Sequence, residues 1–247
     1  MLEMVIECLE DGPLHILDIG CGSGALLQRI ADYYRAQGWN PDEYLLGTDM
    51  DEDFFQAKVP FQVSELTKPL NFQMRSFDLI ITMEVLEHVR SPYTLLEEIY
   101  ATLNPDGKLL FSVPNMMTIV SRFRFLFTGR FRHYDGPSSD PADADSGMGH
   151  INPFPIQYWD YGFRYAGFTD IRYRTDRIKR GALYFSAFLS PLMWLGKHWL
   201  HRQERNKNLR VYQQNLRPFR EINSLRNLAG HGLVATCTKS GNPVSEK

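Results

Sequence analysis

Three glycines stand at every second position of the segment LDIGCGSG, at Gly20, Gly22 and Gly24. A buried strand that runs into such a glycine turn and then into a helix occurs in several nucleotide-binding folds. The spacing differs from the G-x-G-x-x-G of dehydrogenases, because Ala25 stands where their third glycine would be. Asp18 would repel a pyrophosphate, and the turn contains no Lys or Arg to offset its charge. These features favour a ligand with a cationic or ammonium group over a phosphate.

A second candidate binding residue, Asp49, ends the next expected strand in the segment LLGTDMD. An ionised carboxylate only accepts hydrogen bonds, and at this position it can hold both hydroxyls of a ribose. Met50 beside it offers a polarisable surface to a purine ring. The acidic residues that follow can instead cap the N-terminus of a helix. We assign Asp51 and Asp53 to that capping role and Asp49 to the ligand.

Alternating strand and helix patterns predict the scaffold that positions these residues. Strands are expected over residues 14–19, 44–48, 61–63, 77–82, 108–113, 168–174 and 231–238. Helices are expected over residues 24–37, 92–103 and 155–166, and a turn at 104–107 ends the second of them. Residues 133–155 are rich in Gly, Pro, Asp and Ser and are expected to form a long loop. This order is typical of a doubly wound α/β sheet.

Composition is ordinary for a soluble globular protein, with 247 residues of which 43% are hydrophobic and 23% charged. Three scattered cysteines are too few for a disulfide framework or a zinc site, and Cys21 in the glycine turn favours a reducing compartment. The segment MLEMVIECLEDG lacks the basic region of a secretory signal, so we expect a cytoplasmic protein. The net charge of −2 conceals a basic segment, because residues 170–226 hold 13 Lys and Arg against 4 Asp and Glu. An anionic partner is expected for that segment.

Four motifs, in order, resemble those of the class I S-adenosylmethionine-dependent methyltransferases: LDIGCGSG, GTDMD, SFDLIITMEVLEHV and NPDGKLLFSVPN. The resemblance covers residues 14–175 and resumes at 231–238. It implies a Rossmann-like mixed sheet whose last strand is antiparallel, formed by a methyltransferase domain at residues 1–175 and 231–240. Residues 176–230 would then be a basic, partly apolar helical insertion before the last strand.

The resemblance also implies S-adenosylmethionine as the cofactor and assigns residues to it. Gly20, Cys21 and Gly22 would approach the methionine and ribose portions, Asp18 would help to hold the ammonium group, and Asp49 would bind the ribose hydroxyls. Glu65 and Leu66 would flank the adenine, and the backbone of Met83 would meet the amino-acid end. Many relatives have an acidic residue where this chain has Ser64, which leaves the adenine contact less defined. The expected cofactor-binding residues are Asp18, Gly20, Cys21, Gly22, Gly24, Asp49, Met50, Glu65, Leu66 and Met83.

Because a sulfonium already activates the methyl group, the protein mainly supplies proximity and alignment. A general base is needed only if the acceptor must lose a proton, and the candidates are His88, His133, Tyr134 and His150. Glu84, Glu87 and His88 are spaced so that a helix would place them on one face. The same pattern resembles ubiquinone-biosynthesis O-methyltransferases, in which matching positions can hold a divalent metal. The alternative is a helix that packs against the cofactor pocket, and we favour it and assign no metal.

The segment 181–196 has 16 residues without a charge, whereas a bilayer-spanning helix needs about 20, and Pro191 is expected to break it. Basic residues flank it on both sides, which suits an interfacial helix of residues 177–210 on an anionic membrane surface. A dimer interface or a hydrophobic cap on the substrate pocket would use the same residues. The segment SRFRFLFTGRFR, at 121–132, interleaves Arg with Phe and could extend this surface. No RNA-binding module is recognisable, so nucleic acid is an unlikely partner.

The apolar and basic insertion favours a small or amphiphilic methyl acceptor, such as a quinone precursor, a lipid or a lipid-linked glycan. The product would be S-adenosylhomocysteine together with the methylated acceptor. Two other functions remain open from the sequence. One is an NAD(P)-dependent oxidoreductase, and the other is a non-catalytic, membrane-associated scaffold that kept the fold. The expected location is the cytoplasm, with peripheral association at the inner face of the membrane.

Overall fold

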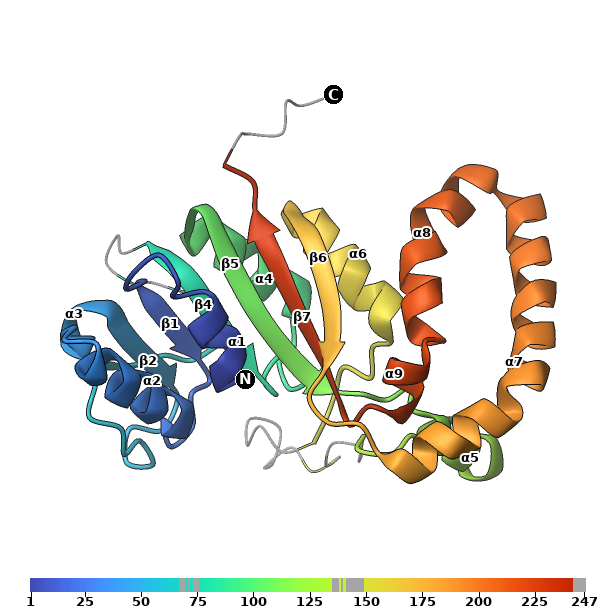
Figure 1. Cartoon of the computed structure of the whole chain (residues 1–247), viewed down its shortest axis with the longest axis horizontal. Coiled ribbons are helices and arrows are strands. Elements are labelled where there is room, and N and C mark those ends of the chain that lie inside the picture. The colour runs from blue at the N-terminus through green and yellow to red at the C-terminus, as the bar shows by residue number, and fades with distance from the viewer. Residues whose placement is uncertain are drawn as a thin grey trace. The chain divides into compact units, whose positions relative to one another are not determined.

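The computed structural model describes residues 1–66, 70, 72, 76–134, 138, 140 and 149–241 (Figure 1). Its helices are α1 (Leu2–Glu7), α2 (Ala25–Ala36), α3 (Pro41–Tyr44), α4 (Pro92–Thr102), α5 (Ile119–Thr128), α6 (Ile156–Ala166), α7 (Arg180–Lys207), α8 (Leu209–Ile222) and α9 (Leu225–Ala229). Its strands are β1 (Ile16–Ile19), β2 (Leu45–Asp49), β3 (Phe61–Val63), β4 (Phe77–Met83), β5 (Leu103–Pro114), β6 (Phe168–Thr175) and β7 (Gly232–Lys239). Most of the loop expected at 133–155 lies outside the described residues.

The strands form one seven-stranded sheet in the order β3-β2-β1-β4-β5-β7-β6. β1 pairs in parallel with β2 and with β4, and β2–β3 and β4–β5 are parallel as well. The last strand, β7, is antiparallel, so the expected mixed Rossmann-like sheet is confirmed (Figure 1). Ile19 lies opposite both Thr48 and Thr82, so β1, β2 and β4 end at the same edge. The chain reverses its direction of winding between β1 and β4, where α/β sheets bind their ligands.

Burial on both faces explains the apolar sequence of the central strands. All four residues of β1 are buried, Asp18 included, as expected for a parallel strand covered by helices. Helix α2 places Leu27, Ile30 and Ala31 in the core. Its Tyr34 hydroxyl donates to the carbonyl of Leu14 at 2.9 Å and accepts from the same residue's N–H at 3.1 Å. This pair of bonds fixes the chain that leads into β1.

The segment NPDG does not form the expected turn between α4 and the next strand. Helix α4 ends at Thr102, and β5 already begins at Leu103. The pairing of β4 with β5 shifts register between Phe77 and Leu79, and Asp106 has a φ of 62°. A register shift beside a left-handed residue is typical of a bulge, in which the strand takes up extra residues without ending. The turn-forming residues therefore bend β5 and do not interrupt it.

Contacts divide the chain into two compact units. The first comprises Met1–Val113, Gly162–Arg172 and Ala235–Lys247, and the second Pro114–Tyr161 and Tyr173–Val234. The second unit contains all of residues 176–230, which were expected to form an insertion, and also α5. It has its own small core, formed by Ile119 of α5, Ala182 of α7, and Leu228 and Ala229 of α9.

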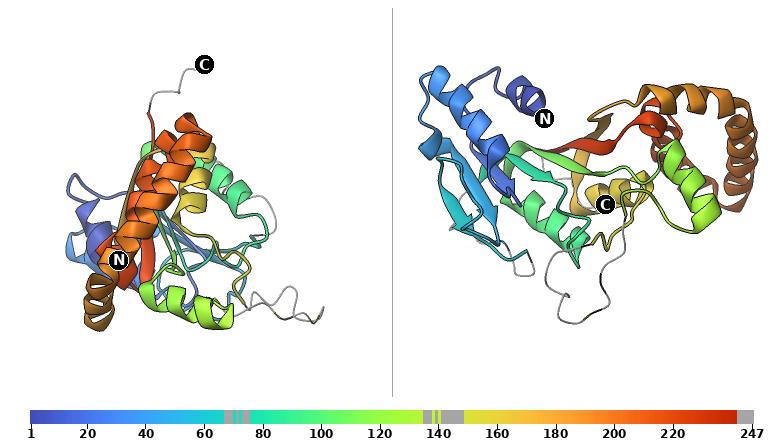
Figure 2. Two further views of the ribbon diagram at one scale, coloured as in Figure 1. Left: turned by 90° about the vertical axis from the view of Figure 1, so that its right-hand side faces the viewer. Right: turned by 90° about the horizontal axis from the view of Figure 1, so that it is seen from below.

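Helix α7 continues through Pro191, so the expected break at this residue is wrong. Proline removes one helical N–H bond and bends a helix, and the α7 ribbon changes direction part-way along (Figure 1). The chain then turns into α8, which runs in the opposite direction; Figure 2 gives two further views of the whole chain. None of the helices in the described ranges is both long and apolar enough to cross a bilayer.

Candidate functional site

The glycine turn between β1 and α2 is the first part of the candidate site, and its three glycines have different surroundings. A side chain on Gly20 would collide with Val85, and one on Gly24 would lie 2.5 Å from the ring of Phe55. Gly22 differs, because a Cβ there would come no closer than 3.8 Å to its nearest neighbour, a ring carbon of Phe54. Gly20 and Gly24 thus allow close packing of the protein, whereas at Gly22, with a φ of 54°, a Cβ would fit in ordinary van der Waals contact with Phe54.

The carboxylate of Asp49 is held at the same edge of the sheet. Its Oδ2 accepts the backbone N–H of Gly22 at 2.8 Å, and its Oδ1 accepts that of Met50 at 2.7 Å. Each oxygen retains a further acceptor position, so the carboxylate can still bind two hydroxyls. The Met50 side chain next to it is 52% exposed and offers a flat apolar contact. The turn itself is tied to β2, because the N–H groups of Gly20 and Cys21 both donate to Thr48.

Asp18 places a second carboxylate beneath the turn. It is 4% exposed, and its side chain makes no hydrogen bond within the described ranges of the chain. Burial, and then the nearby charge of Asp49, raise the pKa of Asp18 from 3.8 to about 8. A buried carboxyl group of this kind is stabilised by a cation, which restores the interactions that water no longer provides. The site therefore has an acceptor suited to an ammonium group, as the sequence indicated.

The thiol of Cys21 is not a nucleophile in this site. Burial, followed by the charges of Asp18 and Asp49, raises its pKa to about 12, so the thiol remains protonated at neutral pH. Reactive cysteines have the opposite environment, with cations or helix N-termini that stabilise the thiolate. Cys21 contributes its backbone to the turn, through its N–H bond to Thr48, and its expected approach to the cofactor stays a prediction.

The end of β3 brings the expected adenine-binding residues next to β2. Asp49 pairs with Val63, and the N–H of Ser64 donates to the carbonyl of Asp49 at 2.9 Å. Glu65 is exposed and Leu66 is partly buried, directly after this pair. Both residues thus follow the strand that flanks Asp49, but their contact with a ligand stays a prediction.

The helix that Asp51 and Asp53 were expected to cap is absent. Asp51 Oδ1 accepts the N–H groups of Asp53 and Phe54, at 3.0 and 3.3 Å, and these bonds close a turn. No helix follows before β3, so the assignment of the acidic cluster to a helix N-cap was wrong. Asp51 does cap backbone N–H groups, because aspartate stabilises such turns as readily as helix ends.

The helix expected across Glu84, Glu87 and His88 is also absent. Strand β4 ends at Met83, Glu84 has a φ of 55°, and a turn closes with His88 N–H donating to Val85 at 2.9 Å. Glu84 is held to β5, since its N–H donates to the carbonyl of Ser112 and its carboxylate accepts the hydroxyl of the same residue. Helical spacing therefore does not describe this segment.

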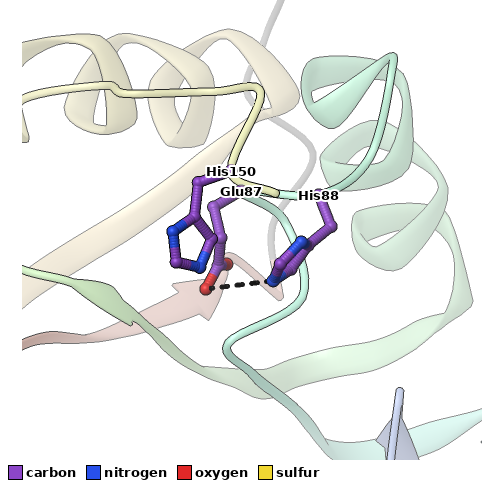
Figure 3. Close-up of side chains that lie close together, drawn as sticks. All are labelled: Glu87, His88 and His150. Carbon is purple, nitrogen blue, oxygen red and sulfur yellow. Dashed lines mark ion pairs between the residues drawn. The ribbon is translucent and has the colours of Figure 1, made fainter. Parts of the chain in front are cut away.

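Glu87 was left out of the expected site residues, although its environment is unusual. The side chain is fully buried, and burial followed by the charge of Glu84 raises its pKa to about 8. His88 Nε2 lies 4.0 Å from Glu87 Oε1, and Figure 3 shows the two side chains facing one another. Strongly shifted carboxyl groups cluster at functional sites. The signal available in the sequence was an acidic residue beside a histidine just after a central strand.

Two further catalytic candidates, Tyr134 and His150, lie in the second unit. Tyr134 is 8% exposed and its hydroxyl donates to the carbonyl of Pro114 at 3.2 Å. Its ring lies 5.0 Å from that of His150, which is partly buried. Within this unit the two residues are neighbours, and the first unit brings together the glycine turn with Asp18 and Asp49. Whether any of these residues takes part in catalysis stays a prediction.

Residues 4–173, more than half of the chain, match the protein family described as "Methyltransferase domain". The chain belongs to this family. With the strand order and the antiparallel last strand, this match shows a class I S-adenosylmethionine-dependent methyltransferase, as the four sequence motifs indicated.

Curated relatives of this methyltransferase have several substrates. Over 111 residues it is 31% identical to "Ubiquinone biosynthesis O-methyltransferase" of Coxiella burnetii, a match that covers 41% of this chain and 44% of that protein. It is 36% identical over 104 residues to "tRNA U34 carboxymethyltransferase" of Pseudoalteromonas translucida, covering 38% of this chain and 30% of that one. The chain thus spans less than half the length of these relatives. Because the second relative is named for tRNA, the comparisons do not support the expectation that nucleic acid is not a partner.

Solved structures of methyltransferases share the fold across nearly the whole chain. A "SAM dependent methyltransferase" from Archaeoglobus fulgidus has a TM-score of 0.52 at 15% identity, covering 97% of this chain and 95% of that one. A "putative methyltransferase" from Haloferax volcanii, in complex with the activator Trm112, has a TM-score of 0.54 at 14% identity, covering 98% and 89%. At these identities the likeness shows the fold alone.

Proposed function

We propose that the methyltransferase binds S-adenosylmethionine at the carboxyl ends of β1, β2 and β4 and methylates a small or amphiphilic acceptor. The observation that carries this proposal is the combination found at the glycine turn. A backbone at Gly22 that no neighbouring side chain crowds, a fixed carboxylate on Asp49 and a buried carboxyl group on Asp18 occur within one turn and the two strands beside it. These groups match a ligand that has both a ribose and an ammonium group.

The residues of the turn would bind and orient the cofactor in distinct ways. Asp49 would accept the ribose hydroxyls, Met50 would contact the purine face, and Asp18 would pair with the ammonium group. When bound, S-adenosylmethionine supplies a methyl group that its sulfonium makes electrophilic. The chain's contribution is then to hold the acceptor in line with that group and to exclude water.

His88 is the candidate base in the first unit for an acceptor that must lose a proton. Its Nε2 lies 4.0 Å from Glu87 Oε1, and the imidazolium formed when His88 takes up a proton would favour ionisation of that buried carboxyl group, which in turn would stabilise the imidazolium. Tyr134 and His150 remain candidates in the second unit. The hydroxyl proton of Tyr134 is already shared with Pro114, which favours a structural role for this residue.

The second unit supports an amphiphilic acceptor and an anionic membrane surface. Large apolar side chains on α7 are exposed, with Phe188 at 79%, Leu192 at 67% and Trp199 at 64%. Basic residues surround them within the segment 177–210, an arrangement that suits the interface of an anionic membrane. The relatives named for ubiquinone biosynthesis agree with such an acceptor. A dimer interface or a cap on the substrate pocket would also bury these side chains.

Thermal unfolding in the presence of candidate ligands tests the cofactor assignment. S-adenosylhomocysteine should raise the melting temperature of the wild-type protein, whereas NAD should not. Asp49→Asn should abolish most of the rise, because an amide cannot accept two hydroxyls in the same way, and the matched variant Asp51→Asn should retain it. Saturable NAD binding without any response to S-adenosylhomocysteine would favour the oxidoreductase instead.

The acceptor can be identified by the fraction of a cell extract that becomes labelled. The protein is incubated with the extract and with S-adenosylmethionine carrying an isotopic methyl group, and lipid, small-molecule, protein and RNA fractions are counted. Label in the lipid or small-molecule fraction is expected. Label in RNA would assign a nucleic-acid substrate, and cofactor binding with no label in any fraction would favour the non-catalytic scaffold.

A further inference from the structure

A cleft in the second unit lies where the N-terminal ends of α5 and α7 meet. Thr118, the N-cap of α5, and Lys179, the N-cap of α7, both line it. Arg132 and His133, from the segment after α5, and His231, from the segment after α9, contribute the other polar side chains. Four of these five side chains are basic, and all five belong to the same unit.

The charges around the cleft are unbalanced. Burial, and then the charges of Arg132 and Arg177, lower the pKa of Lys179, which places these cations near one another. Asp176 is the acidic residue facing them, and its Oδ1 accepts the N–H groups of Arg177 and Gly232. Its Oδ2 lies 3.6 Å from Nδ1 of His231. Because backbone N–H groups and an imidazole share this one carboxylate, positive charge remains in excess.

The helix ends add to this positive field. The first N–H groups of a helix point along its axis, away from the helix, and carry a partial positive charge that attracts anions. Helix α5 is capped by its own Thr118, whose hydroxyl accepts the N–H of Ser121 at 3.2 Å. Helix α7 is 28 residues long and has no side-chain cap at Lys179. The Lys179 N–H donates to the carbonyl of Ala229 at 2.9 Å, and an anion in the cleft would accept from the N–H groups that follow it in the first turn.

An apolar surface shared by α5 and α7 begins next to the cleft. The two helices pack together through Phe123 and Phe185, whose ring centroids are 5.0 Å apart. Beyond that contact Phe127 is 77% exposed and Tyr184 is 74% exposed. Residues 118–134 and 177–203 contain no acidic side chain. A basic cleft beside exposed aromatic and aliphatic side chains matches an amphiphile with an anionic head and an apolar tail.

The cleft itself has a volume of about 10 Å³, room for about one water molecule. We propose that the mouth of this cleft binds a phosphate group, as carried by the head of an anionic amphiphile, through Arg132, Lys179 and the first turn of α7. Guanidinium and ammonium groups form short, charge-assisted hydrogen bonds with phosphate oxygens, and a helix N-terminus supplies further donors. The proposal extends the amphiphilic partner proposed above. Its test measures binding alone, so its failure would leave the cofactor site and methyl transfer unaffected.

Isothermal titration of the full chain with three soluble probes tests the proposal. The probes are inorganic phosphate, monomeric dihexanoyl phosphatidate and dihexanoyl phosphatidylcholine. Phosphatidate is expected to bind in a saturable way, and Arg132→Gln and Lys179→Gln should each weaken it by about tenfold or more. The matched controls Arg220→Gln and Lys108→Gln remove exposed basic residues outside the cleft and should change the dissociation constant by less than about twofold.

The probes also distinguish the source of the phosphate. Phosphatidate that binds more tightly than inorganic phosphate supports a lipid head, and equal affinities support a site for free phosphate. Phosphatidylcholine that binds as tightly as phosphatidate would overturn the proposal, because the tail alone would then explain binding. Equal losses in the control and the cleft variants would overturn it as well, since binding would follow overall charge. An unchanged melting-temperature response to S-adenosylhomocysteine shows that each variant is folded.

Discussion

At the scale of single residues, the glycine turn combines two demands on the backbone. Gly20 and Gly24 lack side chains because Val85 and Phe55 occupy the space that a Cβ would need. Gly22 lacks one although a Cβ there would fit in ordinary van der Waals contact with Phe54. The same sequence motif therefore contains residues that are needed for packing and one residue that leaves room for a ligand, and substitution separates the two roles.

Gly20→Ala and Gly22→Ala should therefore differ in their effects. Both place a side chain at a positive φ, which costs about 1 kcal/mol relative to glycine. Gly20→Ala also overpacks against Val85, so we expect a further loss of about 1–3 kcal/mol in the free energy of unfolding. Gly22→Ala should lose little more stability but most of its affinity for S-adenosylhomocysteine. Urea unfolding and calorimetry measure the two effects, and wild-type affinity in Gly22→Ala would contradict the ligand role.

We expect Asp18 to make cofactor binding dependent on pH. Its pKa of about 8 means that the carboxyl group is mostly protonated at neutral pH in the free protein, yet pairing with an ammonium group requires the carboxylate. We therefore expect affinity for S-adenosylhomocysteine to rise between pH 6 and about 8, with release of a proton on binding. Calorimetry in buffers of different ionisation enthalpy detects that proton. Asp18→Asn should remove both the proton release and the pH dependence, and the absence of a slope in the wild-type protein would contradict this assignment.

The same group affects stability in the opposite direction. The unfolded chain loses the Asp18 proton near 3.8, whereas the folded chain keeps it up to about 8. Between these values the folded state binds more protons, so the stability of the ligand-free protein should fall as pH rises. Urea midpoints at pH 5 and pH 8 measure this loss. Asp18→Asn should flatten the difference, and an equal difference in the variant would assign the pH effect to other groups.

The placement of the candidate cofactor-binding residues at one edge of the sheet could be predicted from the sequence, because the carboxyl ends of adjacent parallel strands meet there. Asp18 and Asp49 needed only the strand assignments to be placed together. The state of Glu87 could not be predicted in this way. Its burial and its contact with His88 depend on a left-handed residue at Glu84 that anchors the segment to Ser112 on another strand.

At the scale of elements, Arg122 of α5 connects this helix to α8 by binding the C-terminal end of α8. Its guanidinium donates to the carbonyl of Ile222 at 2.8 Å and to the side chain of Asn223 at 2.9 Å. A third bond, at 3.0 Å, goes to the carbonyl of Met117. Burial lowers the pKa of Arg122 to about 10, but the group remains charged at neutral pH. A cation at the last carbonyls of a helix also complements the helix dipole.

Arg122→Gln should lower the free energy of unfolding by roughly 2–4 kcal/mol, because it leaves partly buried carbonyl groups without their donors. The matched variant Arg124→Gln changes an exposed residue of the same helix and should alter stability by less than about 0.5 kcal/mol. Urea unfolding followed by circular dichroism measures both. Equal stability of the two variants would show that the bonds of Arg122 contribute little.

The sequence predicted most of the elements but not the contacts that modify them. Apolar patterns identified β1, β2, β4 and the helices α2, α4 and α6 within a residue or two, whereas α3, α5, α8 and α9 were not predicted as separate helices. The errors arose where one local rule was applied without its tertiary context. Pro191 bends α7 without ending it, the NPDG segment bulges within β5, and Glu84 begins a turn in place of a helix. In each case hydrogen bonds to neighbouring segments, or a long helix on both sides, outweigh the local preference.

At the scale of the whole molecule, basic residues and exposed apolar side chains occur together in α5 and α7. Residues 170–226 hold only 4 of the 29 acidic residues but 13 Lys and Arg, and α5 contains arginines and no acidic residue. Composition alone predicted this asymmetry. It could not predict that α5 and α7 pack on one another, because their contact joins segments separated by more than fifty residues.

Vesicle flotation tests the membrane surface. We expect the chain to float with vesicles that contain phosphatidylglycerol and to remain soluble with pure phosphatidylcholine, because basic residues draw it to anionic lipid. Salt at about 0.5 M should weaken binding by screening these charges. Phe127→Ser combined with Phe188→Ser should abolish flotation, whereas Tyr165→Ser, an exposed aromatic residue outside the surface, should not. A protein that stays wholly soluble with anionic vesicles would contradict the membrane surface.

The protonated thiol of Cys21 has a practical consequence for spectroscopy. Maleimide and nitroxide reagents react with thiolates, and a pKa of about 12 leaves almost none at the glycine turn near neutral pH. A cysteine introduced at an exposed site, such as Trp199→Cys on α7, should therefore be labelled selectively once Cys8 has been replaced by serine. Cys237 is buried. Fluorescent or spin-labelled protein can thus be prepared with the cofactor turn chemically intact.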